Sequence, residues 1–238
     1  MEIKLKEKIL NPTIIEGFPG IGLIGTIATE YLIKHLGAKP VGFIKTEDVA
    51  PIAAIHAGKI IQPLELYYIK KKNLLIVHSL IDIQGIEWDL SKSLSELYKQ
   101  VKAKEILSIE GILSQKPTSE AKTYFFSNNA AQSKKLSGKG ADELKDGIVM
   151  GVTAALLLEH ADMVTSGVFV ETHSKLPDSR AAAKVLEVLD KYFGLNLDYK
   201  PLEAAAEQFE KQLKDYVEKV QETTKEADKK NKRVSYLG

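Results

Sequence analysis

The chain has 238 residues, 44% of them hydrophobic and 27% charged, and its 33 Lys and Arg against 32 Asp and Glu give a formal net charge of +1. This composition is that of a folded globular protein, and the near-zero balance excludes a whole-chain attraction to nucleic acid or anionic lipid. The absence of cysteine excludes a disulfide scaffold, a thiolate zinc site and a cysteine nucleophile. The longest apolar run, Ile148 to Leu158, is too short to span a bilayer, so we expect a soluble, cytoplasmic protein.

Short aliphatic runs alternate with amphipathic stretches over the first two hundred residues. The predicted strands are, in chain order, Thr13–Glu16, Pro40–Ile44, Lys59–Ile61, Leu66–Lys70, Leu74–Ser79, Glu105–Glu110, Lys122–Phe126 and Met163–Val170. The predicted helices are a stretch ending at Leu36, then Leu90–Val101, Ile148–His160 and Arg180–Phe193. This alternation predicts one α/β domain over residues 1–200, a three-layer α/β/α sandwich with a mostly parallel central sheet. Residues 56–79 are expected to form a meander instead of a crossover.

The segment 201–228 is predicted to be a long C-terminal helix with a narrow apolar seam. Its apolar positions follow a four-three spacing: Leu202, Ala206, Phe209, Leu213, Tyr216, Val220, Thr223 and Ala227. A heptad seam of this width is typical of a coiled coil, because a helix on a globular core usually has a wider apolar stripe. We therefore expect an oligomerisation helix that makes the protein a homo-oligomer. The alternative is a helix packed on its own domain.

The last ten residues, 229–238, are predicted to be a basic, flexible tail that ends in Tyr236, Leu237 and Gly238. An aromatic ring, an aliphatic side chain and a terminal carboxylate together suit docking into a pocket of a partner protein. These three residues are the candidate partner-binding site. The alternative is an inert, frayed chain end.

A glycine-rich loop follows the first predicted strand, with Gly17, Phe18 and Pro19 preceding Gly20, Gly22 and Gly25. The last three satisfy the G-x-G-x-x-G pattern of dinucleotide sites, in which glycines let pyrophosphate approach the backbone. Phe18 and Pro19, however, place bulk where a phosphate would approach. We therefore expect the loop to be structural, with small residues that let the first helix pack closely on the sheet, and we predict no cofactor.

Polar side chains follow several predicted strands, namely Glu16, His78, Ser79, Asp82, Glu110, Glu171 and His173. Ligands of open α/β sheets bind outside the carboxyl ends of the strands, so these acids could hold a ligand or act as acid and base. Polar residues also end strands for purely structural reasons, and acids there often cap the next helix. None of the five histidines forms an H-x-H or H-x-x-x-H pair, and we predict no metal and assign no catalytic residue.

The stretch from Gly17 to Gly25 resembles the PAC2 family, the proteasome assembly chaperones and their archaeal homologues. The resemblance continues through Ser79–Gly85, through Glu110-Gly111 and through the helix with Gly151-x-x-Ala154-Ala155-Leu156-Leu157, so that it covers most of residues 10–195. It implies a phosphorylase-like α/β/α fold without an established catalytic activity. It also implies that the protein acts as a chaperone or adaptor of the 20S proteasome α-ring.

Some members of this family dock between α-subunits through a C-terminal hydrophobic–Tyr–any-residue motif. Here Tyr236 is third from the end and Leu237 is penultimate, so the tyrosine is displaced by one position. The predicted function is a homo-oligomeric, non-catalytic proteasome assembly chaperone-like protein or adaptor. Its expected partners are itself and either 20S α-subunits or a paralogous chaperone, with no nucleic acid and no membrane. The alternative is a small-molecule enzyme, acting on a nucleoside or a phosphate ester through the strand-end acids.

Overall fold

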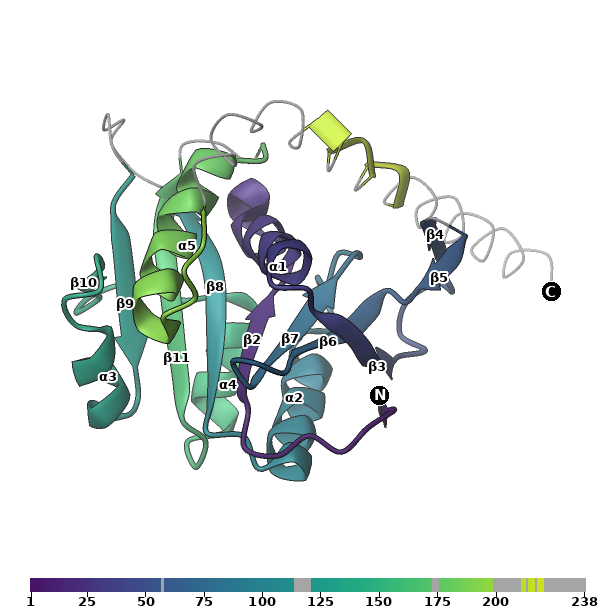
Figure 1. Ribbon diagram of the computed structural model, residues 1–238, viewed down its shortest axis with the longest axis horizontal. Helices are drawn as coiled ribbons and strands as arrows, with labels where there is room; N and C mark the ends of the chain where they lie inside the picture. The colour runs from purple at the N-terminus through teal and green to yellow at the C-terminus, as the bar shows by residue number, and fades with distance from the viewer. Residues whose placement is uncertain are drawn as a thin grey trace.

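Four parallel strands form the centre of the sheet, and each contains buried aliphatic residues because helices cover both faces of the sheet (Figure 1). The structure is a computed structural model of the protein. It describes residues 1–56, 58–113, 121–172, 176–198, 211–212, 214–216 and 218–220. The four central strands, in spatial order, are β7 (Leu74–Ser79), β2 (Thr13–Gly17), β8 (Glu105–Leu113) and β11 (Thr165–Thr172). Their carboxyl ends lie at one edge of the sheet, as parallel pairing requires.

Strands on both flanks extend this centre to nine strands within the described part of the chain, in the order β1-β3-β6-β7-β2-β8-β11-β9-β10. The flanking strands are β1 (Glu2–Leu5), β3 (Lys39–Lys45), β6 (Leu64–Ile69), β9 (Thr123–Ser127) and β10 (Asp142–Glu143). The pairs from β1 to β7 and the β11–β9 pair are antiparallel. The predicted parallel pairing is thus found at the centre and between β9 and β10, and the whole sheet is mixed. The turn between β6 and β7 is too short for a crossover, which parallel pairing would need.

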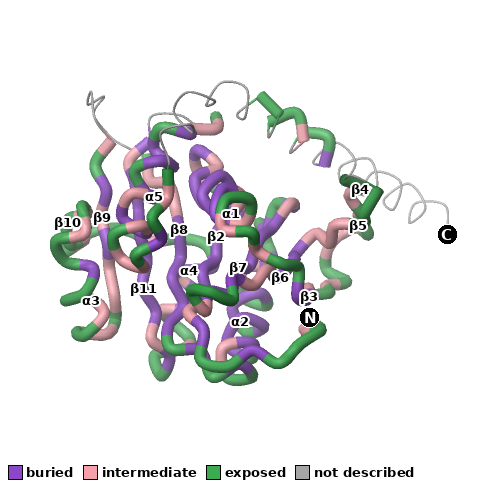
Figure 2. Tube along the Cα trace, in the orientation of Figure 1, coloured by how far each residue is buried: buried purple, intermediate pink, exposed green. Residues whose placement is uncertain are grey.

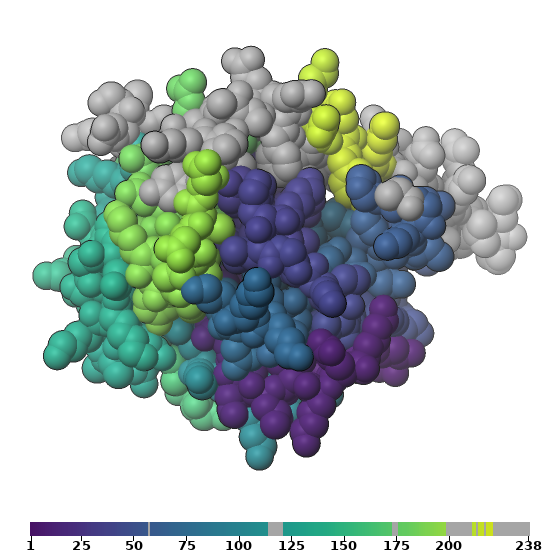
Figure 3. All heavy atoms as spheres, viewed as in Figure 1, coloured from purple at the N-terminus to yellow at the C-terminus, as the bar shows by residue number. Residues whose placement is uncertain are grey.

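Helices cover the two faces of the sheet in pairs, which confirms the three-layer arrangement. α1 (Ile24–His35) and α5 (Ser179–Phe193) pack on one face, which Figure 3 shows from outside. α2 (Glu87–Val101) and α4 (Gly151–Glu159) pack on the other. Figure 2 shows that the buried residues concentrate in the central strands and in the helix faces turned toward them.

Side chains alternate between the two faces along each central strand, and this alternation positions the polar groups at the sheet edge. Ile14 of β2 belongs to the core under α2 and α4, whereas Ile15 belongs to the core under α1 and α5. Glu16 therefore lies on the same face as Ile14. The same rule places Glu110 of β8, together with Ile106, on the α2 and α4 side.

The expected meander over residues 56–79 is confirmed for β6 and β7, which pair as an antiparallel hairpin. Lys59–Ile61 forms β5, but it pairs with β4 (Ala54–His56) in a separate two-stranded sheet. Ile55 and Ile60 of this hairpin are exposed. The sequence analysis did not predict β1, β4, β10, the 3-10 turn Ile21–Leu23 or the short helix α3 (Ala130–Leu136), which packs on β9.

The described residues between 211 and 220 are helical, and they include two members of the predicted seam. Val220 is 8% exposed, and Tyr216 is partly buried with Glu30 of α1 and Tyr67 of β6 in its electrostatic surroundings. Leu202, Ala206, Phe209 and Leu213 lie outside the described residues. Among the helices that the structure describes, none combines the length and the apolar character that crossing a bilayer requires.

Candidate functional site

A cavity of about 690 Å³ opens at the carboxyl edge of the central strands, on the α4 side of the sheet. The glycine-rich loop from Phe18 to Ile21, the end of β8 and the segment 144–152 form its walls. Tyr124 of β9 and Phe169 and Glu171 of β11 close it on the far side. Three strand-end acids predicted from the sequence, Glu16, Glu110 and Glu171, line this one space.

Two of these acids share a single hydroxyl group. Thr153 of α4 donates its proton to Oε1 of Glu110, and the same Thr153 oxygen lies 3.4 Å from Oε1 of Glu16. A threonine hydroxyl carries one hydrogen, so Glu16 does not receive it while Glu110 does. Ser108 lies opposite Glu16 in the β2–β8 ladder, and its hydroxyl is near enough to the Glu16 carboxyl to lower the pKa of that group against the effect of burial.

Burial and mutual repulsion raise the pKa values of this pair. Burial and the nearby Glu110 carboxylate raise the pKa of Glu16 to about 8, and the Glu16 side chain is 1% exposed. Burial raises the pKa of Glu110 to about 7, against the opposing effect of the hydrogen bond from Thr153. At neutral pH the empty pair therefore retains at least one proton, because two adjacent buried carboxylates repel each other.

The third acid, Glu171, has one engaged oxygen and one unengaged oxygen. The hydroxyl of Tyr124 donates to Oε1 of Glu171 over 3.1 Å. Oε2 of Glu171 is buried and has no hydrogen-bond partner among the described residues. Buried polar atoms of folded proteins are nearly always paired, so an unpaired carboxylate oxygen on a cavity wall can still accept a donor.

Three other strand-end residues that the structure describes, His78, Ser79 and Asp82, do not line this cavity. The His78 ring lies under α1, where Nδ1 is 2.8 Å from Oγ1 of Thr29 and Nε2 is 3.5 Å from Glu30. Ser79 bonds within its own turn to Ile81, and Asp82 accepts from the backbone N–H of Gln84. His173 lies outside the described residues. In the described ranges, no three His, Asp or Glu side chains are grouped so that they could hold a metal ion.

The glycine-rich loop brings α1 unusually close to β2 and β8. A Cβ atom on Gly25 would lie 2.6 Å from the carbonyl oxygen of Ile109 and 2.8 Å from Cα of Gly17. Gly22 has φ of 68°, a left-handed conformation that favours glycine. These contacts are those expected of a structural loop, and Phe18 is buried in the core beneath α2. Phe18, Pro19 and Gly20 also line the cavity.

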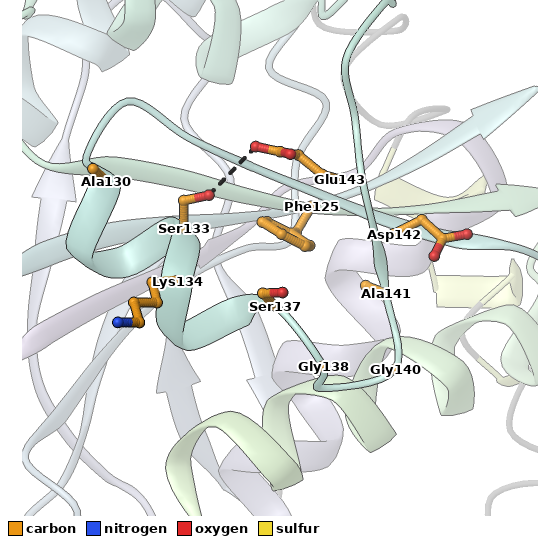
Figure 4. A pocket seen from close by; sticks show the side chains of 10 residues that line it. All are labelled: Phe125, Ala130, Ser133, Lys134, Ser137, Gly138, Gly140, Ala141, Asp142 and Glu143. Atoms are coloured by element: carbon orange, nitrogen blue, oxygen red, sulfur yellow. Dashed lines mark hydrogen bonds between the residues drawn. The ribbon is translucent and has the colours of Figure 1, made fainter.

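A second depression, of about 970 Å³, lies between α3 and the chain that leads into β10 (Figure 4). Phe125 forms its apolar part, and Ser133 of α3 donates to Glu143 over 3.5 Å. Lys134 and Asp142 project at its margin with opposite charges. This depression has no concentration of one chemistry, in contrast to the acid-lined cavity.

Sequence reasoning missed Thr153 and Tyr124, the two hydroxyl groups that contact the acids. Thr153 had a usable signal, because it is the one polar side chain within the apolar run Ile148–Leu158 of the predicted helix. Tyr124 had none, because it is one of three consecutive aromatic or hydrophobic residues in an edge-type strand. The predicted partner-binding residues Tyr236, Leu237 and Gly238 lie outside the described residues.

Comparison with known proteins identifies the family of this chain. A sequence model described as the PAC2 family matches residues 14–217. The chain belongs to the PAC2 family. It is 32% identical to the uncharacterized protein MJ0106 of Methanocaldococcus jannaschii over 219 residues, which is 90% of this chain and 89% of that protein.

Two solved structures from Pyrococcus furiosus show the same fold as this PAC2 protein. One is PbaA, described as an archaeal homolog of proteasome-assembly chaperone, with a TM-score of 0.83 and 30% identity over 93% of this chain and 99% of that chain. The other is PbaB, described as an archaeal proteasome activator, with a TM-score of 0.76 and 23% identity over 90% of this chain and 97% of that chain. At this identity, the likeness to PbaB shows a shared fold alone.

Proposed function

We propose that this PAC2-family protein is a homo-oligomeric, non-catalytic chaperone or adaptor of the cytoplasm that binds 20S proteasome α-subunits or a paralogous chaperone. One observation carries the proposal, the likeness to PbaA over nearly the whole of both chains at 30% identity. Because that likeness includes sequence as well as fold, it supports a related way of acting more strongly than a shared sandwich architecture would.

The alternative, an enzyme acting on a nucleoside or phosphate ester, has the acid-lined cavity in its favour. The sign of the charges there opposes it. The loop that a phosphate would approach faces Glu16 and Glu110, and the described lining residues include no Lys, Arg or His. An anionic phosphoryl group would meet either carboxylates or neutral carboxyls, and the described lining offers no cation to stabilise it. We therefore favour the binding function.

The C-terminal helix is the proposed site of self-association, although two seam residues are already partly or fully buried in the single chain. The Tyr216 hydroxyl is within electrostatic reach of its own domain, because Glu30 raises the pKa of Tyr216 and Tyr216 raises the pKa of Tyr67. Val220 is buried within the single chain. This burial favours intramolecular packing at the Tyr216 and Val220 positions, and Leu202, Ala206, Phe209 and Leu213 are the remaining seam residues proposed to contact another copy.

Truncation after Tyr199 tests self-association directly. Each large apolar side chain of the seam contributes roughly 1.5–3 kcal/mol when fully buried, so loss of the helix should yield a smaller, folded species. Light scattering measures the mass, and circular dichroism checks the fold. A Leu213→Asp variant of the full chain is the matched point change. An unchanged mass in both would show that the helix does not hold the oligomer.

Deletion of Tyr236, Leu237 and Gly238 tests proteasome docking. A buried ring and a paired terminal carboxylate govern dissociation, whereas exposed basic residues act through a screened field and govern association. The deletion should abolish binding to immobilised α-rings in surface plasmon resonance. The matched control, neutralisation of Lys229, Lys230, Lys232 and Arg233, should slow binding and reduce its salt dependence. Equal binding by the intact and shortened chains would assign docking to the globular domain.

A further inference from the structure

The cavity at the carboxyl edge of the sheet has an apolar wall and an acidic floor. Glu16 and Glu110 form the floor, beneath aliphatic side chains from β8 and from the segment 144–152. Leu113, Ile148 and Met150 are 51%, 86% and 64% exposed at residues that line the same space. Its volume of about 690 Å³ falls within the range of about 300–1,000 Å³ found for small-molecule sites.

We propose that this cavity binds an organic cation, an ammonium or guanidinium group carried on an apolar stem, with the cation between Glu16 and Glu110 and the stem along Ile148 and Met150. The inference is independent of proteasome binding, because it concerns the α4 side of the sheet and not the C-terminal segment. It assigns a ligand chemistry to a space that the proposed function does not use.

When its carboxyl groups are charged, the floor has more hydrogen-bond acceptors than donors. Thr153 supplies one hydrogen to two carboxyl groups, and Ser108 is the other hydroxyl near Glu16, which is 1% exposed. Glu171 adds a buried oxygen that no described residue engages. An ammonium group carries three N–H donors and a guanidinium group five, which matches this surplus of acceptors.

The charge of the lining selects a cation. Glu16, Glu110, Glu171 and Asp146 line the cavity, and no Lys, Arg or His is found among its described lining residues. A bare divalent metal is a poor match, because the described acids include no group of three placed to hold one. The apolar walls match a hydrocarbon stem, which a hydrated metal ion lacks. An alkyl cation can pair its charge with the acids and pack its stem against the apolar walls.

Proton release should accompany binding. Burial and the neighbouring Glu110 raise the pKa of Glu16, and burial raises that of Glu110, so the empty floor holds protons near neutral pH. A cation seated between the two groups stabilises their charged forms and expels a proton. The affinity for an amine should therefore increase as pH rises from 6 to 8, while the amine itself stays protonated.

Isothermal titration calorimetry of the full chain with three probes of equal length tests the proposal. Hexylamine, hexan-1-ol and hexanoate share a stem and differ in their polar group. Hexylamine should bind roughly tenfold or more tightly than the alcohol, since a charged group paired with a buried carboxylate is the stronger interaction, and hexanoate should not bind. Titration in two buffers of different ionisation enthalpy should show release of about one proton at pH 6.5.

Two further probes distinguish the source of the cation. The peptide acetyl-Leu-Lys-Leu-amide carries the same ammonium group on a protein side chain, and its norleucine counterpart lacks the charge. Tight binding of hexylamine with weak peptide binding identifies a free amine as the ligand. Tight binding of the lysine peptide over the norleucine peptide identifies a basic side chain of a partner. Either result supports the proposal.

Glu16→Gln and Glu110→Gln keep the shape of each side chain and remove its negative charge. Each should weaken hexylamine binding by roughly tenfold or more and leave hexan-1-ol binding unchanged. Asp82→Asn is the matched control, because Asp82 also follows a strand but does not line the cavity. Equal affinity for amine and alcohol, an amine affinity that is the same at pH 6 and pH 8, or no binding of any cation by the wild-type chain would each overturn the proposal.

Discussion

Glu16 and His78 end neighbouring strands yet have opposite surroundings. In the β2–β7 ladder Glu16 is opposite Val77 and Gly17 is opposite His78, so the two polar residues are one step apart in register. Alternation sends Glu16 toward α4 and the cavity, and His78 toward α1. Both side chains are almost completely buried, at 1% and 2% exposure.

The two residues differ in how their polar atoms are satisfied. Both ring nitrogens of His78 have neighbours, Thr29 at 2.8 Å and Glu30 at 3.5 Å, and the ring meets the edge of Tyr67. Glu16 shares one hydroxyl with Glu110 and faces open volume. A buried polar group that is fully partnered contributes to the packing of the fold, whereas one that faces a cavity without a donor is available to a ligand. The following changes test that contrast, from the largest expected effect to the smallest.

Gly25→Ala should disrupt the close contact that α1 makes with β2 and β8. The added Cβ would lie 2.6 Å from the Ile109 carbonyl and 2.8 Å from the backbone of Gly17, and backbone atoms cannot move aside cheaply. We expect a loss of about 3 kcal/mol or more in the free energy of unfolding, measured by urea denaturation.

Gly20→Ala is the matched control within the same motif. Its φ of −154° suits any residue, and the nearest atom to its new Cβ would be 3.9 Å away, so its stability should change by about 0.5 kcal/mol or less. Similar losses in the two variants would show that the loop does not act through the α1 contact.

The pH dependence of stability should distinguish Glu16 from His78. A carboxyl in the unfolded chain loses its proton near the ordinary value of 4.5, whereas folded Glu16 keeps it to about 8. The folded state binds more protons between these values, so stability should fall as pH rises, by up to about 1.4 kcal/mol per pH unit. Glu16→Gln should remove the contribution of Glu16 and so make the slope smaller.

Thermal unfolding from pH 5 to pH 8 measures the slope, and Asp82→Asn should leave it as in the wild type. Glu110 contributes the same sign over a narrower window, up to its pKa of about 7. A wild-type protein that is equally stable at pH 5 and pH 8 would contradict the raised pKa values and with them the account of a donor-poor floor.

His78→Gln should change stability in the opposite pH range. Burial lowers the pKa of His78, while Glu30 opposes the shift. Below the ordinary value of 6.5 the unfolded chain takes up a proton that the folded ring resists, so stability should fall as pH falls, by less than about 1.4 kcal/mol per pH unit.

Gln retains a donor and an acceptor for Thr29 but does not titrate. Whatever its overall stability, the variant should therefore lose the decrease in stability that His78 causes as pH falls below 6.5. Denaturant midpoints between pH 5 and pH 7 provide the measurement. An acid slope that persists in the variant would have to come from another group, and the enclosed environment of His78 would then not be the cause.

Thr153→Val should destabilise the protein by only about 1 kcal/mol, because it removes one hydroxyl and keeps the shape. The hydrogen bond from Thr153 lowers the pKa of Glu110, so its loss should raise that pKa further. Thr153→Ser, which keeps the hydroxyl, is the control. Carboxyl titration followed by NMR measures the change, and no shift for Glu110 would show that Thr153 does not hold this carboxyl.

Several elements could be predicted because their causes are local. The aliphatic runs of β2, β7 and β8 and the apolar stripe of α2 are readable in the sequence, since burial on both faces or on one stripe demands them. The strand β1 and the two-residue β10 were not predicted, because short edge strands with charged side chains resemble loops. The hairpin β4–β5 was half predicted, since Lys59–Ile61 was identified but its partner was not.

The sequence by itself determined the layered α/β architecture, the close approach at the glycine-rich loop and the presence of acids where strands end. Only the tertiary structure decided which of those acids meet. Strand order places β2, β8 and β11 side by side, and alternation places Glu16, Glu110 and Glu171 on one face while His78 lies on the other. Strand order and facing depend on pairings between residues tens of positions apart, and no local pattern encodes them.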